Sequence, residues 1–133
     1  MKRNATLAAL VCLVTGCALL FTGCQGTVAT SPALPPLSAS EMVGKWVGTA
    51  ENTGGSASGS LYVVLKADGT LYCKAFWSPT GTGTWSVSGS SYTDTQNYAG
   101  ISVSSSGTIS GKTISGKWYA TNGMAGEFEL TKE

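Results

Sequence analysis

Few side chains in this 133-residue sequence are of types that could do chemistry, and their spacing does not favour catalysis. The sequence contains no histidine, so it offers no His-based triad, no imidazole base and no usual zinc site. Glu127 and Glu129 lie two residues apart, which places both carboxylates on one face of a strand, as in a glycosidase pair. They alternate with Phe128 and Leu130, however, and this pattern predicts a solvent-facing side of the strand. We therefore predict a protein that is not an enzyme and needs no metal or cofactor.

A second group of polar side chains lies between two tyrosines. Every second position of one segment is occupied by a member of this group, so all of them lie on the same face of a strand: Tyr92, Asp94, Gln96 and Tyr98. If the tyrosines point into the fold, Asp94 and Gln96 point inward as well and form a polar pocket, where all four are candidate contacts for a ligand or partner. The alternative is an edge strand with polar side chains on both faces. The sequence leaves both interpretations open.

The N-terminal segment has the pattern of a secretory signal. A basic start, Met1–Arg3, precedes an almost wholly apolar run over residues 6–21. Leu20–Cys24 (LFTGC) then resembles the lipobox of bacterial lipoproteins. The resemblance implies cleavage before Cys24, a diacylglyceryl thioether on its thiol and, in many bacteria, a further acyl chain on its amine. Two or three chains give stable membrane anchoring.

Two alternatives to Cys24 remain. Val14–Cys17 (VTGC) also fits the lipobox, but cleavage there would leave the apolar residues 18–21 on the mature N-terminus. The other alternative is an uncleaved membrane helix, for which the apolar stretch is only just long enough. We expect a signal peptide over residues 1–23, a lipidated cysteine with a disordered Pro/Ser/Ala-rich tether over 24–40, and a folded domain over 41–133. An extended tether of this kind spans roughly 50 Å.

Charge and cysteine content restrict the kinds of molecule that this domain can bind and the reactivity of its thiol. Loss of Lys2 and Arg3 with the signal would leave six lysines, seven acidic residues and no arginine, a net charge of −1. Such a domain is a poor nucleic-acid binder, because neutralising phosphates drives that binding. Cys73 would be the one remaining free thiol, and its place in an alternating strand predicts a buried, inert side chain. The predicted location is the cell envelope, through the lipid anchor; Gln25 after the cysteine implies, by the same resemblance, the outer membrane of a Gram-negative cell.

In the folded domain, apolar and polar residues alternate over short segments, and Gly, Ser and Asn separate these segments. The pattern predicts an all-β fold, either a small antiparallel up-and-down β-barrel of about eight short strands or a two-sheet sandwich. The expected strands are 43–51, 60–66, 70–77, 82–88, 91–98, 101–105, 108–120 (broken near Gly111) and 126–132.

One hairpin fixes its own register. A three-residue loop with Gly69 in the left-handed region pairs Leu65 with Leu71 and Val63 with Cys73, and so separates apolar from polar side chains. Extending this alternation predicts the inward-facing residues. They are Trp46, Leu61, Val63, Leu65, Leu71, Cys73, Ala75, Trp77, Trp85, Val87, Ile101, Val103, Ile109, Ile114, Trp118, Phe128 and Leu130.

Three of the four tryptophans follow a glycine by two positions. The pairs are Gly44 with Trp46, Gly83 with Trp85, and Gly116 with Trp118. In each pair the two residues face the same way, so we expect the glycine to leave space for a ring from a neighbouring strand and to permit sharp coiling. The tryptophans are predicted to be structural core, with a stacking platform for a ligand as the alternative.

These motifs resemble a known family. Ser40–Trp46 is similar to the lipocalin or calycin entry, a short helical turn followed by Gly-x-Trp on the first strand. Residues 114–118 and 126–130 resemble the last hairpins of small calycin-like and avidin-like barrels, although no residue set matches a biotin site. The resemblance implies a calycin-like barrel that binds a protein or a small apolar ligand.

Two inhibitor families are the alternative. The entry segment is also similar to that of periplasmic metalloprotease inhibitors, and Ser58–Tyr62 matches the Ser-Gly-x-x-Tyr motif of lysozyme-inhibitor lipoproteins. Both families carry cysteine pairs that this sequence lacks. The function implied would be inhibition of a protease or lysozyme.

Overall fold

The folded domain is a closed β-barrel with one short helix. The computed structural model describes residues 34–35, 37–55, 57–76 and 78–133. The chain divides into two units, Met1–Pro32 and Ala33–Glu133, and the described residues all belong to the second. Its elements, in order, are α2 (Ala39–Met42), β1 (Gly44–Asn52), β2 (Ser58–Leu65), β3 (Thr70–Ala75), β4 (Thr80–Ser88), β5 (Ser91–Tyr98), β6 (Ile101–Ser110), β7 (Thr113–Ala120) and β8 (Ala125–Lys132).

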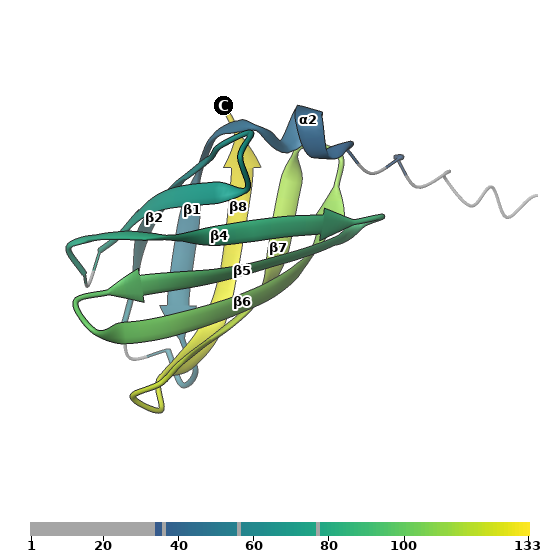
Figure 1. Ribbon diagram of the computed structural model, residues 1–133. Helices are drawn as coiled ribbons and strands as arrows, with labels where there is room; N and C mark the ends of the chain where they lie inside the picture. Colours follow the sequence, from purple (N-terminus) through teal and green to yellow (C-terminus); the bar gives the residue numbers. More distant parts are fainter. Residues whose placement is uncertain (1–33, 36, 56, 77) are drawn as a thin grey trace, which may run out of the picture. The chain divides into compact units, whose positions relative to one another are not determined.

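The strands follow the simplest barrel topology. Each strand pairs antiparallel with the next in sequence, and β8 closes the barrel by pairing with β1. The predicted up-and-down barrel is therefore confirmed, and the two-sheet sandwich is excluded. In Figure 1, β4, β5 and β6 cross the front of the barrel at a steep angle to β1 and β8, which shows how strongly the sheet coils.

The hairpin between β2 and β3 has the predicted register. Leu65 pairs with Leu71 and Val63 with Cys73, and Gly69 has a φ of 81°. The prediction for the sixth strand was wrong, because β6 continues through Gly107 to Ser110 instead of ending at Ser105. The segment Ser104–Gly107 has no apolar alternation of its own, and its pairing with both β5 and β7 holds it as a strand.

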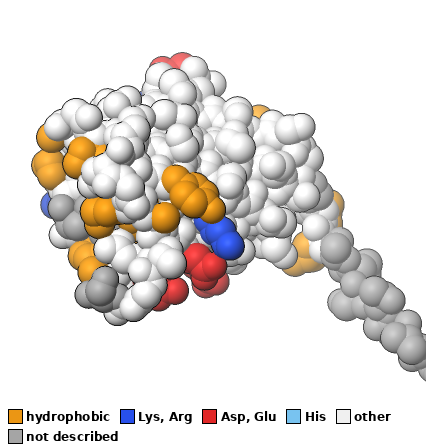
Figure 2. Space-filling view, turned by 90° about the horizontal axis from the view of Figure 1, so that it is seen from below, with side chains coloured by type: hydrophobic (Ala, Val, Ile, Leu, Met, Phe, Trp, Pro, Cys, Tyr) orange, Lys and Arg blue, Asp and Glu red, His pale blue; other side chains and the backbone are white. Residues whose placement is uncertain are grey.

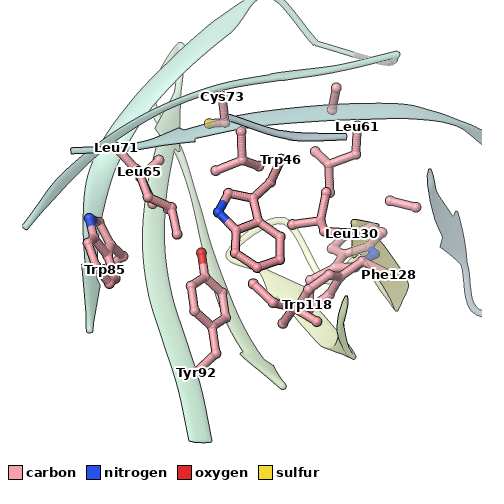
Figure 3. Close-up of a cluster of buried hydrophobic side chains, with 14 of the residues drawn as sticks. Trp46, Leu61, Leu65, Leu71, Cys73, Trp85, Tyr92, Trp118, Phe128 and Leu130 are labelled. Atoms are coloured by element: carbon pink, nitrogen blue, oxygen red, sulfur yellow. The ribbon is translucent and has the colours of Figure 1, made fainter. Parts of the chain in front are cut away.

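The core fills the inside of the barrel and largely matches the predicted inward set. Figure 3 shows Trp46 in the middle of this cluster, with Trp85 on one side and Trp118 beside Phe128 on the other. The core members are Met42, Trp46, Ala50, Leu61, Val63, Leu65, Leu71, Cys73, Ala75, Trp85, Tyr92, Tyr98, Val103, Ile109, Ile114, Trp118, Phe128 and Leu130.

A few positions differ from the predicted core. Ile101 was expected to be buried but is exposed, because it lies at the end of the barrel where no further strand covers it. Val87 is only partly buried, and Met42 and Ala50 join the core although neither was predicted there. Trp77 lies outside the described residues.

Helix α2 covers one end of the barrel, which we call the base. Glu41 accepts hydrogen bonds from the backbone N–H of Ser38 (2.7 Å) and from its hydroxyl (2.6 Å), which fixes the first turn. The fully buried Trp46 donates from Nε1 to the carbonyl of Met42 (2.8 Å), and Lys132 donates to the carbonyl of Glu41. The last strand and the first tryptophan thus hold the helix over the base, near the C-terminus in Figure 1.

The glycines of the Gly-x-Trp pairs are needed for the conformation and close approach of the backbone, and not to make room for the rings. All three tryptophans face inward as predicted, but a Cβ on Gly83 or Gly116 would lie 1.9 Å or 2.0 Å from a carbonyl oxygen of a neighbouring strand. At both glycines the atoms nearest to the missing Cβ belong to the neighbouring backbone, which itself occupies the space. Gly44 instead has a φ of 131°, which L side chains rarely adopt. The glycines therefore permit sharp coiling, and the predicted space for a ring at these pairs was wrong.

Candidate functional site

Strand β5 places a row of polar side chains inside the barrel. Tyr92, Asp94, Gln96 and Tyr98 are all buried, with Asp94 only 7% and Gln96 only 5% exposed. The edge-strand interpretation was wrong, because β5 is paired along its length with β4 on one side and β6 on the other. In a closed barrel one face of β5 must point inward. The face that carries the two tyrosines does so, because their rings are the large apolar groups of this strand.

The row forms a continuous chain of hydrogen bonds. Tyr98 donates its hydroxyl to Oε1 of Gln96, and Gln96 donates from Nε2 to both carboxylate oxygens of Asp94, each at 3.0 Å. Tyr92 donates to Oδ2 of Asp94 at 2.6 Å, and the hydroxyl of Ser105 on β6 also contributes to this carboxylate. The donors thus converge on Asp94.

The carboxylate of Asp94 is electrostatically unusual. All its hydrogen-bond donors are neutral, and no lysine in the described part of the chain lies inside the barrel. Burial raises the pKa of Asp94, although its hydrogen bonds with Tyr92, Ser105 and Gln96 oppose the rise. A buried carboxylate without a cation is costly, and nothing in barrel packing requires it.

A small space lies beside this row. Asp94, Gln96 and Ser105 line it together with apolar side chains that include Phe128 and Trp118, and its volume is ≈ 20 Å³. That is enough for about one water molecule. We call it the inner space.

A larger pocket opens directly outside the inner space. It has a volume of ≈ 240 Å³ and lies at the end of the barrel opposite α2, which we call the open end. Its lining is Ser78, Pro79, Tyr98, Ala99, Ile101, Val103, Trp118, Ala120, Asn122 and Met124, and none of these is charged. Tyr98, Val103 and Trp118 line both spaces, so they form the wall between them. We call this outer space the mouth pocket.

Exposed hydrophobic side chains also gather at the open end. Phe76, Ile101, Tyr119 and Met124 come from different strands and loops that meet there, and Tyr119 is 58% exposed. Figure 2, seen from below the barrel of Figure 1, shows most of the visible hydrophobic side chains on the left of the view, with a small charged group near the middle. An apolar rim of this kind is typical of an interaction surface.

The other candidate residues are placed elsewhere. Glu127 and Glu129 are exposed on the outer face of β8, as predicted, so they do not form an enclosed acid pair. In the Ser58–Tyr62 motif, Leu61 faces the core while the serines and Tyr62 lie on the outer wall of β2. Cys24 and Cys17 lie outside the described residues.

The described residues and the comparisons with known proteins add no further assignment. Among the described residues, no group of three or more Asp, Glu, Cys or His side chains could hold a metal ion. None of the helices in that same part of the chain is long and apolar enough to cross a membrane. In comparisons with known proteins, no family model matches the sequence and no curated protein matches it significantly.

The buried Asp94 predicts a specific pH dependence of stability. Because its folded-state pKa is raised, its contribution to stability is fully present below its unfolded pKa and is lost as pH rises through the folded pKa. Wild type should therefore lose stability relative to Asp94→Asn as pH rises, by about 1.4 kcal/mol per unit of pKa elevation. Urea unfolding from about pH 3.5 to about pH 8 measures this difference.

A variant on the outward face of the same strand is the control. Thr95→Val should follow the wild-type pH profile, since its side chain is exposed. Parallel profiles for wild type and Asp94→Asn would contradict the raised pKa.

Cys73 should be inert in the folded protein. The side chain is buried, and burial raises the pKa of its thiol to about 11. Because the thiolate is the reactive form, we expect negligible alkylation of Cys73 by iodoacetamide near neutral pH and rapid alkylation in denaturant. Mass spectrometry of the Cys73 peptide tests this, and equal rates in the two conditions would show that the thiol is accessible.

Proposed function

We propose that this chain is a lipid-anchored protein of the cell envelope whose calycin-like barrel binds a protein partner through its open end. The observation that carries the proposal is the contrast between the two ends. Helix α2 covers the base, whereas the open end presents an uncharged pocket of ≈ 240 Å³ surrounded by exposed hydrophobic side chains. Aromatic side chains and methionine are enriched at protein interfaces, and Tyr119 and Met124 stand at this rim.

The small inner space argues against a carrier of small apolar ligands. Sites for such ligands usually have volumes of several hundred Å³, whereas the inner space measures ≈ 20 Å³. The mouth pocket is large enough for one side chain presented by a partner. A hydrolase inhibitor would be one such binding protein, and an inhibition assay against lysozyme and envelope proteases distinguishes this alternative.

The direction of the chain agrees with surface anchoring. The chain enters the domain through Leu37 and α2, at the base, so the open end faces away from the point of entry. A tether that ends in a lipidated Cys24 would therefore leave the open end free for a partner.

The lipid attachment at Cys24 is tested separately. The Cys24→Ser variant should remain as uncleaved precursor or leave the membrane, and mass spectrometry of the wild-type N-terminus should find acylated Cys24. Acylation at Cys17 would contradict this assignment.

The partner-binding proposal is tested by variants of the rim. Tyr119→Ser with Met124→Ser should lose a partner that co-purifies with the full-length chain from envelope extract. Ser86→Ala with Ser88→Ala, on the outer face of β4 near the base, removes exposed side chains from a different surface and should retain the same partner. Equal recovery with both pairs would contradict binding at the open end.

A further inference from the structure

The buried row contains one carboxyl group, Asp94, that no lysine of the described residues approaches. The lysines of the described chain are on the outside: Lys45, Lys66, Lys74, Lys112 and Lys117 are exposed, and Lys132 bonds the carbonyl of Glu41 at the base. An ionised carboxylate in such surroundings is stabilised most by a cation that comes close to it. Because Asp94 lines the inner space, that is where a cation could reach it.

The two adjoining spaces have the dimensions of a particular kind of group. The inner space admits about one water molecule, and an ammonium group is of similar size. The mouth pocket, at ≈ 240 Å³, exceeds the ~150 Å³ that holds a benzene molecule, and its lining carries no charge. A movement of Tyr98, Val103 or Trp118, which form the shared wall, would join the two spaces.

From this arrangement we propose that the open end receives a primary alkylammonium group, with its apolar stem in the mouth pocket and its ammonium beside Asp94. The source is either a lysine side chain of a protein partner, whose four-carbon stem and charged end match this shape, or a free amine. The inference rests on the proposed role of the open end in binding. A carboxylate would be repelled by Asp94, and a wholly apolar group would leave the buried charge without a counter-ion.

The pH dependence of this binding is set by Asp94. The other titratable groups that face it are Tyr92 and Tyr98 on its own strand and Cys73 on β3. The pKa of each of these three is raised, mainly by burial, so they stay neutral near neutral pH. Binding of an alkylammonium should therefore strengthen as pH rises through the pKa of Asp94.

Two small probes of matched length test the charge requirement. The full-length chain in lipid nanodiscs is titrated with n-butylamine or 1-butanol, and the indole N–H signals of Trp118 and Trp85 are followed by NMR. Trp118 lines both spaces, whereas the indole N–H of Trp85 donates to the backbone carbonyl of Lys66 near the base and is an internal control. Near neutral pH we expect the amine to shift Trp118 selectively, with a Kd at least ten-fold lower than that of the alcohol, a difference of about 1.4 kcal/mol.

Two comparisons assign this preference to Asp94. Asp94→Asn should bind both probes equally, while Glu129→Gln, which removes a carboxylate from the exposed outer face, should keep the preference. If Asp94→Asn does not fold, the wild-type pH series decides: the amine stays protonated throughout, so its advantage should vanish only as Asp94 is protonated. Equal affinities for the two probes, no response of Trp118, or an unchanged preference in folded Asp94→Asn would each overturn the inference.

A further pair of probes separates the two sources. Lysine blocked at both its α-amino and carboxyl groups should bind at least as well as n-butylamine if the natural group is a lysine side chain, and blocked norleucine is its neutral match. Binding of n-butylamine alone points to a free amine. If none of these probes binds but the rim variants still lose the partner, the ammonium inference fails and the proposed role of the open end stands.

Discussion

Trp46→Ala is expected to unfold most of the protein under conditions where wild type is folded. The side chain is completely buried at the centre of the core, and its indole N–H holds α2 over the base. Truncation of a buried Trp to Ala costs ~3–5 kcal/mol, against a total stability of ~5–15 kcal/mol for a typical domain. Urea unfolding of the full-length chain measures this loss.

An exposed aromatic residue provides the matched comparison. Tyr119→Ala removes a ring that is 58% exposed, so its stability should stay within about 0.5 kcal/mol of wild type. A near-wild-type midpoint for Trp46→Ala would show that the tryptophan is not part of the packed core, and would restore the ligand-platform alternative.

Gly116→Ala is expected to be as damaging as a large core truncation, although it adds only one methyl group. Its Cβ would lie 2.0 Å from the carbonyl oxygen of Ser106 and 2.5 Å from the Cα of Gly107. The obstacle is backbone, so β6 and β7 would have to separate. Overpacking typically costs about 1–3 kcal/mol, and we expect a loss at or above the upper end of that range, measured by thermal or urea unfolding.

A turn glycine serves as the control for this substitution. Gly89 has a φ of 59° and no atom near the position of its missing Cβ, and asparagine tolerates such a conformation. Gly89→Asn should therefore cost less than about 1 kcal/mol. A similar small cost for Gly116→Ala would mean that the strands are not held as closely as the structure places them.

The strands, and most of the side chains that point into the barrel, were predictable because apolar and polar residues alternate along a half-buried strand. The β2–β3 hairpin is the clearest case, since its tight turn left two registers and only one separated lysines from aliphatic side chains. The helical turn before Trp46 was expected from resemblance alone, and the structure places α2 there. The full length of β6 could not be predicted, since Ser104–Gly107 reads as a loop until its neighbours on both sides are known.

The site was harder to predict than the fold, for a physical reason. Within Tyr92–Tyr98 neither face is apolar, so the sequence could not decide whether Asp94 points inward. Closure of the barrel decided it, and closure depends on pairing between β1 and β8 at the two ends of the domain. The mouth pocket likewise brings together residues from three separate connections, whose proximity no local pattern encodes.

The same long-range effect explains the error about glycine. Gly-x-Trp places glycine and ring on one face, which suggested a space for packing. The distances show that the neighbouring carbonyl fills that space at Gly83 and Gly116. Elsewhere a ring does lie over a glycine: a Cβ on Gly81 would be 2.7 Å from the ring of Tyr98. Sequence alone does not distinguish these uses, because both need only the absence of a side chain.

Photo-crosslinking in intact cells is the most direct test of binding through the open end. A benzophenone amino acid is introduced into the full-length chain at Tyr119 or Met124, at the rim, and at Ser86 or Ser88, on the outer wall of β4. We predict one common protein adduct from both rim positions and none of that mass from either wall position. Adducts of that mass from the wall positions, with none from the rim, would contradict the proposed role of the open end.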